Sequence, residues 1–341
     1  MIENIYIRVD ANSTIGTGHL VRTEILADEL SKDNLRINFI CKNIPNNDIS
    51  RLENKAYTVS VIDQEKSELE SILPIIRKRS IVIIDSDNPE FYTKNFQTNI
   101  RRNDIKLMMI TFYHEHHFYA DIVLNQNIMA LGQEYSSEIY SEKLLGPEYV
   151  ILKNDYRLIT KNLSQHKFSK KGKVILLTFG GVDQPDRTKF VYQALLKANS
   201  KIDKIIIVQG SMYKKDIDFD DIVAMSKVKT EIYKNTPKMP YLLAESDVVF
   251  NSGGLTVWES GVLKSLNVIL AFSDREQIGG RYIGDNKLGF YWGTKDSYSI
   301  GSLSKKIDNL LNRDNNQMIE NLFSKIDVNG ISKVVNVIKA L

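Results

Sequence analysis

Short apolar runs rich in β-branched residues alternate with amphipathic stretches along most of this chain of 341 residues. In the first half these runs predict strands at residues 5–9, 37–41, 58–62, 80–85, 107–111 and 122–125. The clearest helices are expected between them, at residues 19–30 and 67–77. This alternation is typical of βαβ units, in which helices pack on the faces of a parallel sheet.

A second alternating series follows a polar segment, residues 159–173, that is rich in Lys, Ser, Asn and Gln. The series predicts strands at 174–179, 204–209, 247–251, 268–272 and 290–292, and helices at 187–197, 239–244, 254–263 and 302–311. Since a domain holds about 150 residues, the chain is long enough for two. We therefore predict an α/β protein of two Rossmann-like domains, residues 1–158 and 174–341, whose parallel sheets face a central cleft. Residues 159–173 form the linker.

Composition limits the kinds of partner and site. The chain has 45 Lys and Arg against 42 Asp and Glu, a net charge of +3, which is too even to indicate a nucleic-acid partner. The single cysteine, Cys41, excludes an intramolecular disulfide and a cysteine-based zinc site, and we expect it in the core. No apolar run approaches the ~20 residues that span a bilayer, and no signal pattern precedes the first strand. We therefore expect a cytoplasmic protein without an integral membrane segment. The sequence does not predict its oligomeric state.

The loop after the first predicted strand has the pattern Gly16-Thr17-Gly18-His19. Glycines at a strand-to-helix turn let the backbone approach a ligand closely, and the start of a helix favours negative charge. Histidine is the side chain whose ordinary pKa best suits proton transfer near neutral pH. We therefore expect Gly16, Thr17 and Gly18 to bind substrate and His19 to be catalytic; the alternative is a capping or core histidine. The spacing differs from Gly-x-Gly-x-x-Gly and does not indicate a dinucleotide site.

Further polar residues are expected near this loop. Arg22 would meet a phosphate or carboxylate, or else pair at the surface with Glu24 or Asp28. Asp85 and Asp87 follow the fourth predicted strand, where carboxylates orient sugar hydroxyls or act as general acid or base. The alternative for this acidic cluster is capping of the next helix. We assign Asp85 and Asp87 to the candidate catalytic group.

A histidine-rich segment, residues 114–117, has a metal-like composition. Neighbouring residues of one segment do not face one way, however, and no separate partner ligands are evident. We therefore prefer a polar loop that lines the cleft, and we expect no metal.

Two glycine pairs follow strands in the second half, Gly180-Gly181 and Gly253-Gly254. Backbone N–H groups before a helix can cradle a diphosphate, and Glu259, five residues beyond the second pair, can accept both hydroxyls of a ribose. One pair alone would indicate only a tight turn. Two pairs with an acidic residue favour nucleotide binding. The residues expected to contact the nucleotide or its sugar are Gly180, Gly181, Ser252, Gly253, Gly254, Leu255, Thr256, Glu259 and Gln277.

Four segments, residues 16–22, 120–127, 144–153 and 252–259, together resemble the UDP-2,4-diacetamido-2,4,6-trideoxy-β-L-altropyranose hydrolases of pseudaminic acid biosynthesis. The segment 144–153 is the most specific of the four. These enzymes release UDP from a nucleotide sugar. Their superfamily includes the GT-B glycosyltransferase that makes peptidoglycan lipid II and the spore-coat polysaccharide proteins. In order and spacing the resemblance covers residues 5 to 295.

The resemblance implies a two-domain GT-B fold with UDP mainly on the second domain, the sugar in the cleft, and no metal or other cofactor. His19 would be the histidine that activates water, and Asn125 and Asn127 would line the sugar site. Two positions depart from the family pattern. Asp87 stands where the family has a tyrosine, and residues 111–114 lack the usual acidic pair after the fifth strand.

The function expected is hydrolysis of a UDP-linked diacetamido-trideoxy sugar by water that His19 activates. Because both departures fall near the expected sugar site, a related nucleotide sugar or an acceptor other than water stays open. The first alternative is therefore a GT-B glycosyltransferase that uses a UDP-sugar donor. A hydrolysing epimerase of the same fold and a nucleotide-sugar-binding protein without catalysis are the others.

Overall fold

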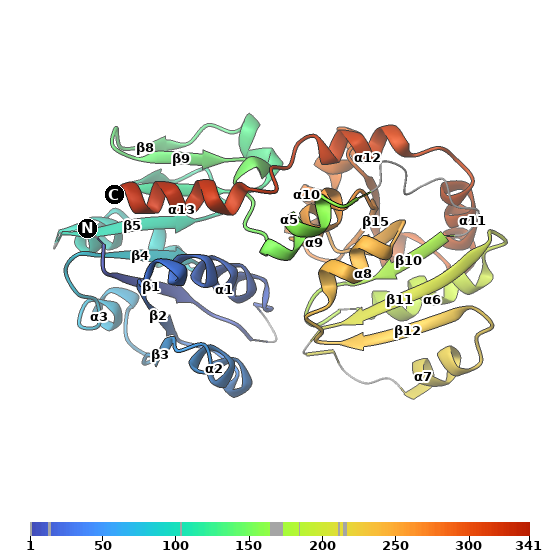
Figure 1. The fold of residues 1–341 in the computed structure, drawn as a ribbon, viewed down its shortest axis with the longest axis horizontal. Coiled ribbons are helices and arrows are strands. Elements are labelled where there is room, and N and C mark those ends of the chain that lie inside the picture. Colours follow the sequence, from blue (N-terminus) through green and yellow to red (C-terminus); the bar gives the residue numbers. More distant parts are fainter. Residues whose placement is uncertain are drawn as a thin grey trace. The chain divides into compact units, whose positions relative to one another are not determined.

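The computed structural model describes residues 2–12, 15–102, 104–163, 173–183, 185–210, 212–213 and 217–341. It divides the chain into two compact units (Figure 1). The first unit contains Met1–Leu152 and Asp327–Leu341, and the second contains Lys153–Ile326. Each is built from parallel strands and helices, as the alternation predicts.

The first unit contains a seven-stranded parallel sheet of order β3-β2-β1-β4-β5-β7-β9. Its strands are β1 (Asn4–Val9), β2 (Arg36–Cys41), β3 (Thr58–Val61), β4 (Ser80–Asp85), β5 (Ile105–Ile110), β7 (Ile122–Asn125) and β9 (Glu142–Leu145). Val9 pairs in register with Asp85, so β1 and β4 end side by side. A small separate sheet joins β6 (His117–Phe118) to β8 (Ser136–Ser137).

Helices pack on both faces of this first sheet. They are α1 (Gly18–Leu30), α2 (Asn46–Glu53), α3 (Glu68–Ile72), α4 (Lys94–Arg101) and α13 (Gly330–Ala340), with short 3-10 helices η1 (Ser31–Asp33), η2 (Pro89–Tyr92), η3 (Ile128–Gly132) and η4 (Pro147–Tyr149). One core lies between the sheet and α1 and α13, and a second lies between the opposite face and α4 and η2. Cys41 is buried in the first core, as expected.

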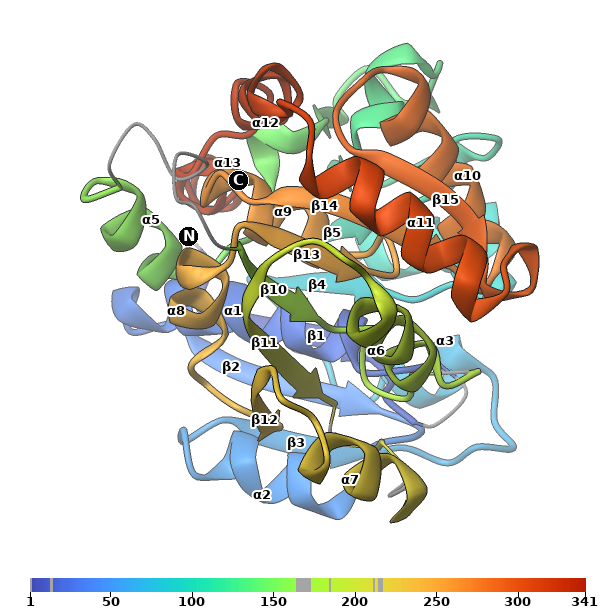
Figure 2. The same cartoon turned by 90° about the vertical axis from the view of Figure 1, so that its right-hand side faces the viewer.

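The second unit has a six-stranded parallel sheet of order β12-β11-β10-β13-β14-β15. The strands are β10 (Lys173–Leu177), β11 (Ile202–Gln209), β12 (Lys229–Lys234), β13 (Val248–Asn251), β14 (Leu266–Ala271) and β15 (Phe290–Thr294). The helices are α5 (Asn154–Thr160), α6 (Arg187–Lys197), α7 (Ile217–Ala224), α8 (Met239–Glu245), α9 (Thr256–Val262), α10 (Asp274–Asp285), α11 (Ile300–Leu311) and α12 (Asn316–Phe323), with η5 (Lys295–Ser297). Figure 2 shows α6 and α11 together on one face, where both contribute to the core.

The expected domain limits are wrong at the C-terminal end and near residue 158. Residues 327–341 belong to the first unit, because Val334 and Ile338 of α13 pack in its core. Sequence order alone does not say which sheet a C-terminal helix covers. The second unit begins at Lys153, and α5 lies within it. Of the predicted linker, residues 164–172 lie outside the described residues.

One predicted helix is also shorter than expected. The helix predicted at 67–77 is α3, Glu68–Ile72, because Pro74 disfavours helical backbone at the residue before it. No helix within the described part of the chain is long and apolar enough to cross a membrane.

Candidate active site

A histidine and a buried aspartate meet where β4 ends and α1 begins. His19 lies in the first turn of α1, and its Nδ1 is 2.5 Å from Asp85 Oδ1. Asp85 is the last residue of β4 and is 1% exposed, whereas the His19 side chain is half-buried. Because a carboxylate accepts hydrogen bonds, we assign the Nδ1 proton to this contact. The other ring nitrogen, Nε2, then carries a lone pair that can accept a proton.

Arg22 completes this group and does not pair at the surface. Its Nε donates to Asp85 Oδ2 at 2.8 Å, and its Nη2 donates to Asp85 Oδ1 at 2.6 Å. The expected alternative partners are engaged elsewhere: Glu24 pairs with Arg51 and Lys55, and Asp28 pairs with Lys55. The bidentate geometry fixes the Asp85 carboxylate against rotation.

The surroundings keep Asp85 ionised. Burial alone would raise the pKa of Asp85, but Arg22 and His19 outweigh burial and hold it well below its ordinary value. Burial would likewise lower the pKa of Arg22, and Asp85 raises it instead. The imidazole therefore faces a permanent ion pair, which holds the ring in one orientation.

Asp87 faces the other side of the imidazole. Its Oδ2 lies 4.0 Å from His19 Nε2, and its side chain is exposed. Behind it, the Tyr92 hydroxyl donates to the Ser86 carbonyl at 3.1 Å and lies 3.0 Å from Thr111 Oγ1. Burial raises the pKa of Tyr92, so this hydroxyl remains a donor and holds the segment that carries Asp87.

The loop before α1 has the open glycines that the sequence predicts. Gly16 has φ +82°, and its N–H donates to the Asn12 carbonyl at 2.8 Å. A Cβ added at Gly16 or Gly18 would meet nothing within 4 Å. Thr17 is the N-cap residue of α1, yet its side chain makes no capping hydrogen bond within the described chain. Among the described residues, Gly16 and Gly18 therefore leave open space beside their backbone.

Asn125 is placed differently from its expected role. Its side chain is 1% exposed, and its Nδ2 donates to the Tyr135 hydroxyl at 2.7 Å and the Phe112 carbonyl at 3.3 Å. Its Oδ1 accepts from both the backbone N–H and the side-chain amide of Asn127. Asn125 therefore holds the backbone that follows β7 in place. Asn127 is the more accessible of the two side chains.

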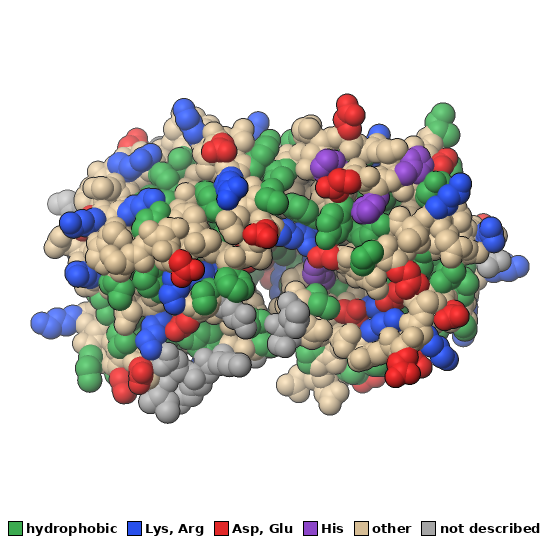
Figure 3. Space-filling model, turned by 180° about the vertical axis from the view of Figure 1, so that it is seen from behind, with side chains coloured by type: hydrophobic (Ala, Val, Ile, Leu, Met, Phe, Trp, Pro, Cys, Tyr) green, Lys and Arg blue, Asp and Glu red, His purple; other side chains and the backbone are tan. Residues whose placement is uncertain are grey.

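The histidine-rich segment 114–117 does not form a metal cluster. His116 stacks near Tyr92 at a ring distance of 4.7 Å, while His117 contacts Ser136 and Glu138. Histidine side chains, purple in Figure 3, reach one face of the molecule. No group of three or more His, Cys, Asp or Glu in the described ranges is arranged to hold a metal ion.

In the second unit the two glycine pairs follow β10 and β13. Gly180 has φ +80° and Gly253 has φ +92°. The Gly253 N–H donates to Asn251 Oδ1 at 2.8 Å and is thus already engaged with a side chain of the protein. The buried Asn251 amide is itself held by Asn267 at 2.7 Å. The sequence did not predict the contact between Asn251 and the Gly253 N–H. Its pattern identifies Asn251 only as the last residue of a strand, and the contact depends on the side-chain rotamer.

Gly210 is another position that the sequence did not single out. A Cβ added there would lie 2.4 Å from Gly181 Cα and 2.5 Å from the Gly180 carbonyl oxygen. The end of β11 therefore packs directly against the first glycine pair, and only glycine fits.

Exchanging Gly253 for alanine should destabilise the protein by about 1–2 kcal/mol, because its positive φ disfavours a side chain. The added Cβ would also lie 3.2 Å from Ile269 Cγ2. Gly254→Ala is the matched control, since a Cβ there meets nothing within 4 Å. Denaturant unfolding compares the two variants. Equal stabilities would contradict this account of the loop.

Glu259 lies in α9 and is half-buried. The hydroxyl of Tyr156, from α5, hydrogen bonds to its carboxylate, and Thr256 makes a further hydrogen bond. Burial raises the pKa of Glu259, although Tyr156 and Lys153 oppose the shift. Three other residues expected to contact the nucleotide lie near the starts of helices. Ser252 and Leu255 precede α9, and Gln277 lies in the first turns of α10.

Arg187 ties the loop after β10 to the loop after β14. Its guanidinium is 3% exposed, and Nη1 donates to the Leu270 carbonyl and to Glu276, each at 3.0 Å. Nη2 lies 3.5 Å from the Phe179 carbonyl, directly before Gly180. Arg187 and Glu276 are 89 residues apart in sequence, so no local sequence pattern predicts their contact.

No family model matches the chain. An uncharacterized protein of Methanocaldococcus jannaschii is 28% identical over 265 residues, which are 75% of this chain and 53% of that protein. The chain thus spans about half the length of this curated relative.

Solved structures resemble the whole chain. MurG of Acinetobacter baumannii superposes with a TM-score of 0.69 at 12% identity, covering 100% of both chains. This is the GT-B glycosyltransferase fold. The spinosyn rhamnosyltransferase SpnG complexed with thymidine diphosphate has a TM-score of 0.65 at 9% identity, covering 99% of both chains. HepE of Anabaena in complex with UDP and glucose has a TM-score of 0.58 at 11% identity, covering 99% of this chain and 100% of HepE. At these identities the likeness establishes the fold.

Proposed function

We propose that this protein hydrolyses a UDP-linked diacetamido-trideoxy sugar and releases UDP. The observation that carries the proposal is the contact between His19 Nδ1 and the buried, ionised Asp85. This contact leaves His19 Nε2 as a base, in the arrangement that histidine bases share across unrelated enzymes. The resemblance of the four sequence segments to the hydrolases supports the choice of water as nucleophile and of this sugar class.

In the proposed reaction a water oxygen attacks the anomeric carbon, and the bond from that carbon to the diphosphate oxygen breaks. The water proton passes to His19 Nε2, and UDP leaves with the bonding electron pair. Asp85 compensates the positive charge that His19 acquires, while Arg22 keeps the carboxylate in place. Asp87, 4.0 Å from Nε2, orients water or a sugar hydroxyl.

The second unit supplies the nucleotide contacts in this proposal. Backbone N–H groups of Gly180, Gly181 and Gly254 bind the diphosphate and stabilise the charge of the leaving group. Glu259 accepts the ribose hydroxyls. Support comes from two structures of the same fold, which hold thymidine diphosphate and UDP.

Release of UDP without any acceptor tests the proposal. The purified protein is mixed with a set of UDP-linked N-acetylated and diacetamido sugars, and UDP is followed by an enzyme-coupled assay. The proposal expects the diacetamido-trideoxy donor to be consumed fastest. Binding of UDP by calorimetry together with no turnover of any donor would contradict it.

The second candidate is a GT-B glycosyltransferase with a UDP-sugar donor, and the likeness to the glycosyltransferases MurG and SpnG favours it. The same His19 base would then deprotonate an acceptor hydroxyl. A glycosyltransferase would release UDP only when an acceptor is added, whereas a hydrolase releases UDP without one. The acceptor-free assay therefore distinguishes the two functions.

Glu259→Gln should weaken UDP binding by about 1.5–3 kcal/mol, the value of a hydrogen bond to a charged group. In the wild type the carboxylate must be ionised to accept both ribose hydroxyls. Since burial raises the pKa of Glu259, UDP affinity should rise with pH through a point above the ordinary glutamate value of 4.5. Calorimetry across pH measures this rise. The rise of affinity with pH should be absent for UDP binding to Glu259→Gln. It should also be absent for a UDP analogue without ribose hydroxyls binding to the wild type. A rise that persists in Glu259→Gln would contradict the assignment.

A further inference from the structure

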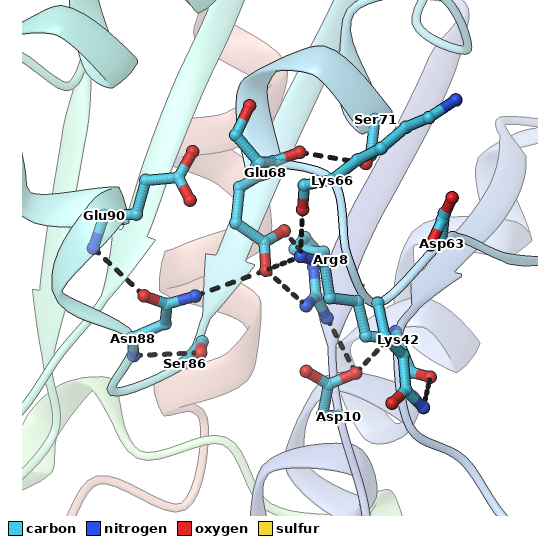
Figure 4. A network of polar contacts seen from close by, with 12 residues as sticks. Arg8, Asp10, Lys42, Asp63, Lys66, Glu68, Ser71, Ser86, Asn88 and Glu90 are labelled. Carbon is cyan, nitrogen blue, oxygen red and sulfur yellow. Dashed lines mark hydrogen bonds and ion pairs between the residues drawn. The ribbon is translucent and has the colours of Figure 1, made fainter.

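A buried ion-pair network lies at the carboxyl ends of β1, β2 and β4 (Figure 4). Its centre is Arg8 of β1, whose side chain is 1% exposed. The Arg8 Nε and Nη2 atoms each lie 2.8 Å from a different oxygen of the buried Glu68, at the start of α3. The third nitrogen, Nη1, is 2.8 Å from Asp10 Oδ1. One guanidinium therefore joins two carboxylates from two different loops.

The Asp10 arm reaches the loop that precedes α1, the helix that carries His19. Asp10 Oδ1 accepts the backbone N–H of Lys42 at 2.7 Å and of Asn43 at 2.9 Å. The next residue, Ala11, donates its N–H to the Asn43 carbonyl at 2.8 Å. The first residues of the loop between β1 and α1 are thus tied to the end of β2.

The Glu68 arm reaches the segment that follows Asp85 and Asp87. Glu68 Oε1 accepts from Asn88 Nδ2 at 3.3 Å, and the neighbouring Leu69 N–H donates to Glu90 at 3.2 Å. Asn88 also caps η2, since its Oδ1 accepts from the Glu90 N–H. Glu68 therefore fixes the segment on the other side of the histidine–aspartate contact.

The charges of this network balance, with Arg8 and Lys42 against Asp10 and Glu68. A buried ion pair is nevertheless a poor source of stability, because desolvation offsets the attraction, and apolar residues often replace such pairs without loss. Its location indicates another role. The two arms hold the loop that precedes α1, the helix of His19, and the segment that follows β4, the strand of Asp85.

We propose that Arg8 is a positioning residue, which through Asp10 holds the loop before α1 and through Glu68 holds the segment after β4, so that His19 and Asp85 keep the geometry of proton transfer. The inference rests on the proposed function for its kinetic consequence, but its geometric consequence at His19 does not depend on the substrate.

The test replaces the buried pair by apolar residues of similar size, Arg8→Met with Glu68→Leu, in the full-length protein. The variant should keep wild-type thermal stability while kcat falls about 10²-fold, as for a small misplacement of reacting groups. The KM for the donor should change less than about twofold, because the proposed nucleotide contacts lie in the second unit. Wild-type kcat in a variant of wild-type stability would overturn the proposal.

The matched control is Arg101→Met, which removes another bidentate pair of the first unit, Arg101 with Asp121 at 2.9 and 3.0 Å. That pair lies near the start of β5 and β7, at the opposite edge of the sheet. The control should leave kcat unchanged. Asn88→Asp is a second, milder variant: it keeps the capping oxygen but loses the donor to Glu68, and kcat should fall about tenfold.

A spectroscopic readout separates this inference from the proposed function. The His19 Nδ1 proton in the hydrogen bond to Asp85 should give a downfield NMR signal, assigned by its loss in His19→Ala. The double variant should shift or broaden that signal, and Arg101→Met should not. An unchanged signal in the double variant would overturn the positioning role. Absence of turnover in the wild type would overturn only the proposed function.

Discussion

Replacing His19 with alanine is expected to lower kcat by about 10²–10⁴-fold, the range that a positioned general base contributes. The affinity for UDP should stay within about twofold of the wild type, since the proposed nucleotide contacts lie in the second unit. Steady-state release of UDP gives kcat, and calorimetry gives the affinity. His19→Asn should behave in the same way, because an amide keeps polarity but does not take up a proton.

The control for this loss is His117→Ala. His117 contacts Ser136 and Glu138 in the small sheet and has no part in the proposed chemistry. Its replacement should leave turnover intact. Full activity in His19→Ala would remove the base on which the mechanism depends.

Asp85→Asn should lower kcat by about 10⁴-fold, because the amide can hold the wrong imidazole tautomer and does not balance the imidazolium charge. It should also destabilise the protein by about 3 kcal/mol, since Arg22 is left as a largely buried cation without its partner. Chemical denaturation measures the free energy of unfolding, and the UDP assay measures kcat.

The double variant Asp85→Asn with Arg22→Met separates these two effects. Removing the cation should restore most of the stability, while kcat stays low. Recovery of both together would show that Asp85 acts only through folding.

The pH dependence of stability follows from the same pair. The folded pKa of Asp85 is depressed, so its contribution to stability is complete above the unfolded value of about 3.9 and is lost as pH falls toward the folded pKa. Asp85→Asn should therefore flatten the acid limb of the stability curve. An unchanged acid limb would contradict the ion pair.

The strand pattern predicted the fold because buried parallel strands are rich in apolar, β-branched residues, as in the run of residues 81–84 in β4, which is fully buried along its length. The C-terminal domain limit was wrong because sequence order does not show which sheet the last residues cover: α13 packs in the core of the first unit and contacts α1. The helix expected at 67–77 ends at Ile72, because Pro74 disfavours helical backbone at the residue before it.

The site was predictable where it follows strand ends. His19 and Asp85 both stand at the carboxyl edge of the sheet, and the register of Val9 with Asp85 brings those ends together. The partner of Arg22 was not predictable, because it lies 63 residues away in sequence and the choice between Asp85 and a nearer carboxylate depends on packing. The hydrogen bond from the Gly253 N–H to the Asn251 side chain is likewise not predictable from residue spacing.

The most direct test of the proposed function is an acceptor-free incubation of the protein with UDP-linked diacetamido-trideoxy-altrose in ¹⁸O-water, followed by NMR and mass spectrometry. We predict UDP and free sugar in equal amounts, with one ¹⁸O at the sugar's anomeric carbon, from the wild type and not from His19→Ala. Bound UDP without release of sugar, or release that requires an added acceptor, would contradict the hydrolase and favour the glycosyltransferase.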